Sequence, residues 1–239
     1  MATKLKAGYE LIKVFSAIGR ITGEATLDFK PECLSISELS PSAITMSSVD
    51  VKPSLLQEYV ANTEVKVGVN LENLNAMLKT LDKHSDFTIS VSNNILEIKT
   101  EHKMFNVPII DVKSTTNKMQ EIEYTNIIRM KAGELKEILK DLKQINNYAH
   151  FYIANSTLKM QTEGDAGSVE NEYTNVVVKN TEPITNTCFN IEEIRKLIKD
   201  AGNKDMIELY LKQNEPLKVV IELAGQKVKS FLAPYMGEN

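Results

Sequence analysis

The sequence predicts an α+β fold made of two similar domains in tandem, and two observations lead to this fold class. One pattern occurs twice: an amphipathic segment, a polar turn and then alternating apolar residues. It runs from Val69 as VNLENLNAMLKTLDKHSDFTISV and from Phe189 as FNIEEIRKLIKDAGNKDMIELYL. A polar stretch with no sustained period, residues 111–122, separates the two halves. Repetition over this length indicates a duplicated structural unit.

Each copy of this pattern predicts a helix followed by a strand. Asn70 matches Asn190 at the start of the helical part, and Lys79 matches Lys199 at its end. The apolar residues between them follow the i, i+3, i+4 spacing of an amphipathic helix. The residues after the polar turn alternate, as in a half-buried strand.

A second pair of helices is predicted after the tripeptide Lys-Ala-Gly, which occurs at residues 6–8 and 131–133. In both places the tripeptide is expected to open an amphipathic helix that leads into strand-like alternation. We therefore expect four short helices, each followed by several short strands. The predicted organisation is a domain at 1–112, a connecting linker at 113–122 and a second domain at 123–239.

Bulk composition narrows the function classes. The chain has a net charge of −4, 42% apolar and 25% charged residues, which is ordinary for a soluble globular protein. We see no signal peptide and no apolar run long enough to span a membrane. Cys33 and Cys188 are expected to be buried thiols in a reducing compartment, and the three histidines have no metal-ligand spacing. We expect no metal and no cofactor.

Catalytic motifs are missing from the sequence, which predicts no catalytic residues and no enzyme. The chain has no Gly-rich phosphate loop, HExxH, GxSxG or CxxC. Glu163 and Asp165 form a close acidic pair that suggests a carboxylate site. Their glycine-containing context, TEGDAG, favours a hairpin turn instead.

Basic residues recur on the predicted helices, on the side away from the apolar stripe. The acidic pI of about 5.6 argues against a nucleic-acid binder unless one face is locally basic. An ordinary solvated face is the alternative for any single helix, and acidic residues share these faces. Such a surface suits loose, sequence-independent contact with phosphates. The candidate DNA-binding residues are Lys13, Arg20, Lys79, Lys83, Lys136, Lys140, Lys143, Lys196 and Lys199.

The order and spacing of several short motifs resemble a known family. They include residues 34–46 (LSISELSPSAITM), residues 67–71 (VGVNL), residues 107–111 (VPIID) and the terminal FLAP at 231–234. With these motifs the chain resembles, over nearly its whole length, the DNA sliding clamps of the proliferating cell nuclear antigen (PCNA) type. Gly19 and Ala76 depart from the pattern, since some of these clamps have lysine there.

The resemblance implies a non-enzymatic DNA polymerase processivity factor. Three two-domain subunits would form a pseudo-sixfold ring around double-stranded DNA, with the helices lining the hole. A clamp loader opens such rings, and DNA polymerase, flap nuclease and ligase dock with PCNA-interacting peptides. No membrane partner is implied. The expected place is the archaeal cytoplasm, at the nucleoid, or the nucleus if the source is eukaryotic; the shortness of the chain after Pro234 favours the archaeal source.

The family's peptide pocket maps onto residues that the pattern alone assigns to ordinary core. An apolar cleft of this kind suits a short helical turn with aromatic anchors. The resemblance places there Leu39, Ala43, Ile44 and Met46 on one wall, Met119 and Gln120 in the linker, and Pro216, Phe231, Ala233 and Pro234 on the C-terminal side.

Subunit contacts are implied at two edge strands, residues 101–107 (EHKMFNV) and 168–174 (SVENEYT). Complementary charge on such edges favours their pairing over pairing of like with like. The interface residues are His102, Lys103, Phe105, Glu170, Glu172 and Tyr173. A homotrimer is expected, and a heterotrimer of paralogues stays open. Two further alternatives are a checkpoint-type or paralogous clamp subunit, and a clamp-fold peptide-binding scaffold that acts without DNA.

Overall fold

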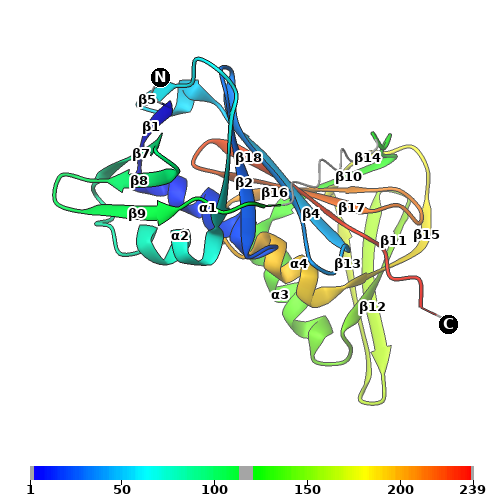
Figure 1. The fold of residues 1–239 in the computed structure, drawn as a ribbon. Coiled ribbons are helices and arrows are strands. Elements are labelled where there is room, and N and C mark those ends of the chain that lie inside the picture. Colours follow the sequence, from blue (N-terminus) through cyan, green and yellow to red (C-terminus); the bar gives the residue numbers. More distant parts are fainter. Residues whose placement is uncertain (1–2, 113–120, 238–239) are drawn as a thin grey trace. The chain divides into compact units, whose positions relative to one another are not determined.

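A computed structural model describes residues 3–112 and 121–237 (Figure 1). The chain divides into two compact units. Unit 1 comprises Met1–Asn117 with Leu223–Val228, and unit 2 comprises Lys118–Glu222 with Lys229–Asn239. The predicted linker falls largely on residues 113–120, which lie outside the described part of the chain.

Unit 1 contains antiparallel strands and two α-helices, α1 (Ile12–Gly19) and α2 (Leu71–Leu78). One sheet has the order β5-β1-β7-β8-β9, and a second group has the order β4-β3-β2-β6. The described residues of this unit also form two short 3-10 turns, η1 (Tyr9–Leu11) and η2 (Pro53–Leu55). The strands are β1 (Thr3–Gly8), β2 (Glu24–Lys30), β3 (Cys33–Leu39), β4 (Thr45–Val51), β5 (Glu58–Val60), β6 (Val65–Asn70), β7 (Asp86–Ser92), β8 (Ile95–Lys99) and β9 (Met104–Pro108).

Unit 2 repeats this plan with helices α3 (Ala132–Lys143) and α4 (Ile191–Ile198). One sheet has the order β13-β12-β11-β15, and a second group has the order β14-β10-β16-β17. The last strand, β18 (Gln226–Leu232), contributes residues to both units. The other strands are β10 (Asn126–Lys131), β11 (Tyr148–Ala154), β12 (Thr157–Gly164), β13 (Gly167–Thr174), β14 (Val177–Asn180), β15 (Ile184–Asn190), β16 (Met206–Leu211) and β17 (Leu217–Leu223).

This α+β architecture confirms the predicted fold class, and the two halves of the repeat match residue by residue at the helix ends. Asn70 is the N-cap of α2, and its side chain accepts a hydrogen bond from the Asn73 N–H. Asn190 is the N-cap of α4, and its side chain accepts hydrogen bonds from the N–H groups of Glu192 and Glu193. Such caps satisfy backbone donors that have no partner inside the helix.

One expected helix start is wrong. Residues 6–8 do not open a helix, because they form the end of β1, whose side chains alternate between buried and half-buried. β1 pairs with β7 on one side and β5 on the other, and α1 begins only after the turn at η1. In unit 2 the helix α3 does begin at Ala132, directly after β10. The same tripeptide therefore sits at slightly different points of the strand-to-helix turn.

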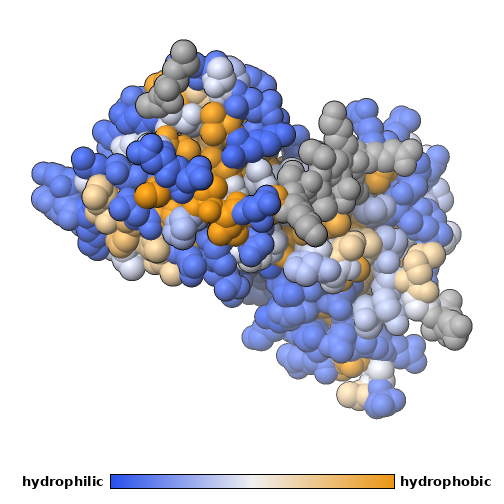
Figure 2. All heavy atoms as spheres, in the orientation of Figure 1, coloured by the Kyte–Doolittle hydropathy of each residue, from blue (hydrophilic) through white to orange (hydrophobic). Residues whose placement is uncertain are grey.

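The inward faces of the helices and strands build an apolar core in each unit. Phe15, Phe29 and Phe87 are fully buried in unit 1, as are Phe151 and Phe189 in unit 2. Figure 2 shows hydrophilic residues over most of the visible surface, with apolar residues gathered on part of the visible face of unit 1. Within the described residues, no helix is long and apolar enough to cross a membrane.

Close packing of α1 on α2 explains a departure noted in the sequence. A side chain on Gly19 would meet the Asn75 Nδ2 atom at 2.5 Å. That amide donates a 3.1 Å hydrogen bond to the Phe15 backbone oxygen. A lysine at residue 19 would have to displace this buried contact between the two helices.

Candidate functional site

The predicted basic residues fall into two groups according to what their side chains contact. The structure shows no hydrogen bond or ion pair for four of the ammonium groups within 3–112 and 121–237. These four residues are all exposed: Lys79, Lys83, Lys140 and Lys199. An exposed ammonium group with no protein partner is available to a phosphate.

The remaining predicted cations already contact the protein. Lys13 pairs with Glu10 and Lys196 with Glu193, and both are exposed pairs between residues three apart. Lys143 donates to the Asn147 side chain. Exposed pairs of this kind are worth roughly 0–1 kcal/mol, so a phosphate can compete for these lysines. Arg20, half-buried at the C-cap of α1, also has a partner within the protein.

Lys136 has a structural contact that its place on the predicted helix did not indicate. Its ammonium group donates to the backbone oxygen of Ala201 at 2.6 Å and to that of Lys199 at 3.3 Å. These carbonyls lie at the C-terminal end of α4, where helix oxygens lack intrahelical partners. Lys136 thus ties α3 to the end of α4, while Lys140 on the next turn stays exposed.

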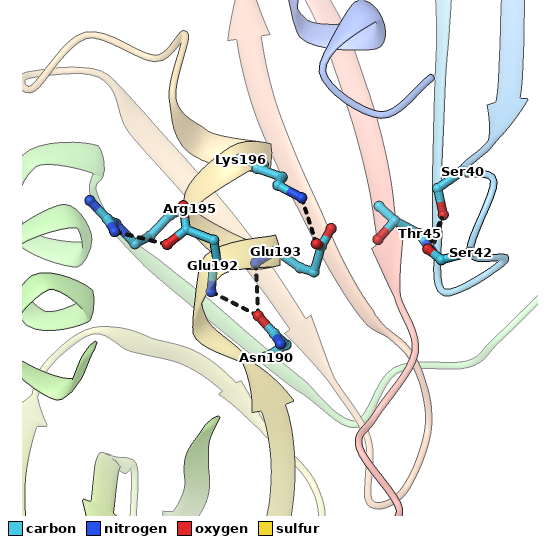
Figure 3. A network of polar contacts seen from close by, with 8 residues as sticks. All are labelled: Ser40, Ser42, Thr45, Asn190, Glu192, Glu193, Arg195 and Lys196. Carbon is cyan, nitrogen blue, oxygen red and sulfur yellow. Dashed lines mark hydrogen bonds and ion pairs between the residues drawn. The ribbon is translucent and has the colours of Figure 1, made fainter. Parts of the chain in front are cut away.

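Helix α4 shows how acidic residues share the basic face (Figure 3). Arg195 pairs with Glu192 at 2.9 Å, and Lys196 pairs with Glu193 at 2.7 Å. The two glutamates lie in the first turn, beside the Asn190 cap, where the helix dipole favours negative charge. The basic face of α4 is therefore largely neutralised, apart from Lys199 at its C-cap.

In unit 1, a tight turn presents the predicted peptide-binding residues. The Ser40 N–H donates to the Thr45 oxygen at 2.7 Å, and the Thr45 N–H donates to the Ser40 hydroxyl at 3.1 Å. The Ser40 and Ser42 hydroxyls lie 3.1 Å apart (Figure 3). Ala43 has a positive φ of 57°, which places it in the left-handed region. The turn leaves the Ile44 side chain 40% exposed.

The other two residues predicted on this wall differ in exposure. Leu39, at the end of β3, is half-buried, and Met46, in β4, is buried. An exposed isoleucine on an ordered turn is available for docking, whereas Met46 can only support the wall from beneath.

In unit 2, two of the predicted peptide-binding residues, Pro216 and Phe231, lie beside an aromatic cluster that the sequence did not indicate. Phe231, Pro216, Ala233 and Pro234 are all half-buried. The Lys218 ammonium group lies 6.0 Å from the Phe231 ring centre and 4.6 Å from that of Tyr210. Tyr124 packs edge-on against Tyr210, and its hydroxyl donates to the Pro216 oxygen. Met119 and Gln120 lie outside the described residues.

Lys218 is a further candidate for this surface. Burial lowers the pKa of its ammonium group, and the nearby Lys229 adds to that effect. A cation over several aromatic rings gains electrostatic attraction to the ring faces. Only the fold brings Lys218 against Tyr124, which precedes it by 94 residues, so no local pattern could have identified the pair.

The predicted subunit contacts lie at genuine sheet edges. β9 is the terminal strand of its sheet in unit 1, and β13 is a terminal strand in unit 2. Phe105 lies in β9, but His102 and Lys103 lie in the turn before it rather than in the strand. Lys103 donates to the Thr80 oxygen. The contacts themselves stay a prediction.

Charge on the β13 edge is partly satisfied within the chain. Glu170 pairs with Lys159 on the neighbouring strand at 3.1 Å. Glu172 is exposed, and Tyr173 is half-buried. Burial, followed by the acidic residues of α3, raises the pKa of the Tyr173 hydroxyl. This side of unit 2 is therefore acidic.

The two acidic residues that were weighed as a carboxylate site lie in a hairpin. Glu163 pairs with Ser168 across the β12–β13 hairpin, so Asp165 lies in its turn, as its glycine-containing context favoured. Burial raises the pKa of the Cys188 thiol to about 11, which keeps it protonated and weakly nucleophilic. The described residues contain no cluster of three metal-ligating side chains.

Two family models match the chain. The model described as "Proliferating cell nuclear antigen, N-terminal domain" matches residues 1–126, and its C-terminal counterpart matches residues 118–236. A protein of Methanococcus maripaludis named DNA polymerase sliding clamp is 24% identical, over 93% of this chain and 94% of that protein. A protein of the same name from Pyrococcus horikoshii is 23% identical, over 96% of each chain.

Solved structures show the same fold. A. fulgidus PCNA, solved with the bound C-terminal region of FEN-1, superposes with a TM-score of 0.91 at 23% identity, covering 99% of this chain and all of that one. A chain from the PCNA2–PCNA3 complex of Sulfolobus tokodaii superposes with a TM-score of 0.84 at 21% identity, covering 98% of this chain and 99% of that one.

Proposed function

Because the chain belongs to the proliferating cell nuclear antigen family, we propose that it is a DNA sliding clamp, a ring that encircles duplex DNA and keeps DNA polymerase on its template. The observation that carries the proposal is the repetition of exposed lysines at matched places. Lys79 and Lys199 are the C-caps of the equivalent helices α2 and α4. The protein would act by encircling DNA and binding other proteins, and it would catalyse no reaction itself.

Contact with DNA would be loose and independent of sequence. The four unpartnered lysines supply single charges to phosphates, which hold a duplex by counterion release. Such contacts permit sliding, because no register along the duplex is preferred.

The ring would close through β9 of one copy and β13 of the next. Each is a terminal strand with backbone groups available for pairing. A contact between two different surfaces is head-to-tail, so it must close into a ring or else propagate. Three copies would give six similar units around the hole.

Partner proteins would dock through short peptides at the surfaces around Ile44 and Phe231. Both residues are apolar and partly exposed, Ile44 in unit 1 and Phe231 in unit 2. The A. fulgidus relative was solved with the C-terminal region of FEN-1 bound. We include a DNA polymerase, a clamp loader, a flap nuclease and a ligase among the proposed partners. The proposed place of action is chromosomal DNA, in an archaeal cytoplasm or a eukaryotic nucleus.

Light scattering after size-exclusion chromatography, followed by primer extension, tests this function. We expect the purified chain to have three times the mass of one 26.8 kDa chain. With a clamp loader and ATP, it should lengthen the products that a polymerase makes per binding event on circular DNA. Linear DNA with open ends should lose the ring by sliding. A trimer that has no effect on product length would refute the clamp function.

A subunit of a mixed ring is the second candidate. The Sulfolobus tokodaii relative was solved as a PCNA2–PCNA3 complex, which motivates this alternative. A monomer mass for the pure chain, together with a trimer mass after paralogues from the same source are added, would favour the mixed ring. A monomer that binds client peptides but never DNA would favour a peptide-binding scaffold.

A further inference from the structure

The sheet that contains β13 has a second terminal strand, β15. The two edges differ in whether other parts of the chain form hydrogen bonds with them. An unpaired edge presents backbone N–H and C=O groups on which another chain can add a strand. A protein that assembles by edge pairing therefore needs to keep other edges closed.

Gln213, in the turn after β16, covers one end of the β15 edge. Its side-chain oxygen accepts a hydrogen bond from the Thr185 N–H at 2.9 Å, and its amide nitrogen donates to the Asn186 oxygen at 2.6 Å. The Gln213 side-chain amide thus hydrogen-bonds one backbone N–H and one backbone carbonyl of β15. A neighbouring strand would make the same two kinds of bond. The next residue, Asn214, donates its N–H to the Thr187 hydroxyl at 3.3 Å.

The C-terminal segment covers the next part of the same edge. The Tyr235 N–H donates to the Cys188 oxygen at 2.8 Å. The Tyr235 ring stacks on Tyr148, with ring centres 4.0 Å apart and planes inclined by 26°. Stacking of two aromatic rings at this separation adds attraction beyond the area that it buries. This contact holds the segment in place although the Tyr235 side chain is 48% exposed.

β13 has no comparable cover. It pairs with β12 along its whole length, from Gly167 to Thr174. Within the described residues, no backbone hydrogen bond reaches its other side. The sheet therefore has one closed edge and one open edge of eight residues.

We propose that Gln213 and Tyr235 form an edge cap, which prevents β15 from pairing with another chain and leaves β13 as the one edge of this sheet that is open to a second copy. This inference rests on the proposed strand-paired assembly. The cap makes association directional, because each unit 2 then offers one open edge in this sheet. Without the cap, finished assemblies would join through their β15 edges.

The test compares the wild type with the double variant Gln213→Ala, Tyr235→Ala by light scattering over a range of concentrations, in the presence of a reductant. We expect the variant to form concentration-dependent species heavier than the wild-type assembly, with unchanged secondary structure by circular dichroism. The matched control is Met236→Ala, since Met236 is 74% exposed and its neighbour Tyr235 makes the capping contacts. The control should keep the wild-type mass.

Two further measurements keep the test decisive. In a Cys33→Ser background, a disulfide reagent should label Cys188 at least tenfold faster in the variant, which shows that the cap has opened. Adding Thr185→Lys to the variant should restore the wild-type mass, because a lysine on an edge opposes strand addition. Faster labelling with an unchanged mass would overturn the proposal. If the wild type is a monomer, that result contradicts the proposed ring and not the cap. The cap is tested only by comparing the mass of the variant with that of the wild type.

Discussion

Lys79 and Lys199 occupy the same position in two different helices. Each is the C-cap residue of an eight-residue helix, each is exposed, and each follows a fully buried residue, Leu78 or Ile198. A cation at a helix C-terminus also gains about 0.3–1 kcal/mol from the helix dipole at low ionic strength. The two lysines thus stabilise their helices while remaining available to an external phosphate.

Reversing the charge of Lys79, Lys140 and Lys199 together should weaken clamp loading and shorten polymerase products. Each substitution removes an unpartnered ammonium group. The slope of log affinity for DNA against log salt concentration should therefore fall by about one for each residue changed. Primer extension and a salt titration measure these effects. The matched control reverses three exposed lysines on strands and loops, Lys52, Lys66 and Lys227. Equal loss in both variants would point to net charge rather than to the helices.

Ile44→Arg and Phe231→Ala should each weaken binding of a PCNA-interacting peptide at least tenfold while the assembled mass stays unchanged. Ile44 lies exposed on its turn, so arginine there opposes an apolar ligand without disturbing the core. Fluorescence anisotropy with a labelled peptide measures the affinity. Leu55→Arg is the control, because Leu55 is a similarly exposed apolar residue on η2. Wild-type affinity in both variants would reject this site.

Asn190→Ala should destabilise unit 2 by about 1–2 kcal/mol, since its side chain accepts from the N–H groups of both Glu192 and Glu193. Asn70→Ala removes only one such bond and should cost less, about 0.5–1 kcal/mol. Urea denaturation measures both changes. Asn73→Ala, at an exposed position inside α2, is the control and should leave stability equal or slightly higher. Equal costs for the two caps would contradict this argument.

Gly68→Ala should destabilise unit 1 by about 1–3 kcal/mol. A Cβ atom there would meet the Ile110 backbone oxygen at 2.2 Å and the Val112 side chain at 2.8 Å. Ile110 forms an antiparallel bridge with Gly68 at this point of β6, and its N–H donates to the Gly68 oxygen at 2.9 Å. Gly8→Ala is the control, because its nearest atom would be 3.8 Å away. Thermal melting of the two variants should differ clearly.

The buried carboxyl of Glu38 should make stability fall as pH rises. Burial raises the pKa of this group in the folded protein, and the 2.6 Å hydrogen bond from the Thr26 N–H opposes the shift only in part. The folded state therefore binds the proton more tightly than the unfolded state, whose pKa is about 4.3. Stability is lost from that pH upward through the folded pKa.

Glu38→Gln mimics the protonated form and should flatten this dependence, so the variant is more stable than the wild type near neutral pH and similar to it in acid. Urea denaturation between about pH 4 and pH 8 tests the slope. Glu32→Gln, in the exposed turn between β2 and β3, is the control and should leave the slope unchanged. A variant with the wild-type slope would remove Glu38 as the cause.

Sequence by itself determined the elements whose causes are local. The period of the apolar residues predicted the four α-helices that the described residues form. The repeat predicted the matched positions of Asn70 and Asn190 as well as those of Lys79 and Lys199. The hairpin turn at Asp165 was also favoured by its neighbours in the sequence. Helix periodicity, capping and turn chemistry act within a few residues, so they can be recognised in a single chain.

Only the tertiary structure decided which side chains and strand edges are open to an external ligand and which are already bonded within the chain. It turned Lys136 onto the end of α4, brought Lys218 against Phe231, and covered the β15 edge with Gln213 and Tyr235. It also placed residues 6–8 in β1, where pairing with strands far along the chain outweighed the local helical spacing. These contacts join residues distant in sequence, so their energies have no counterpart in any short sequence pattern.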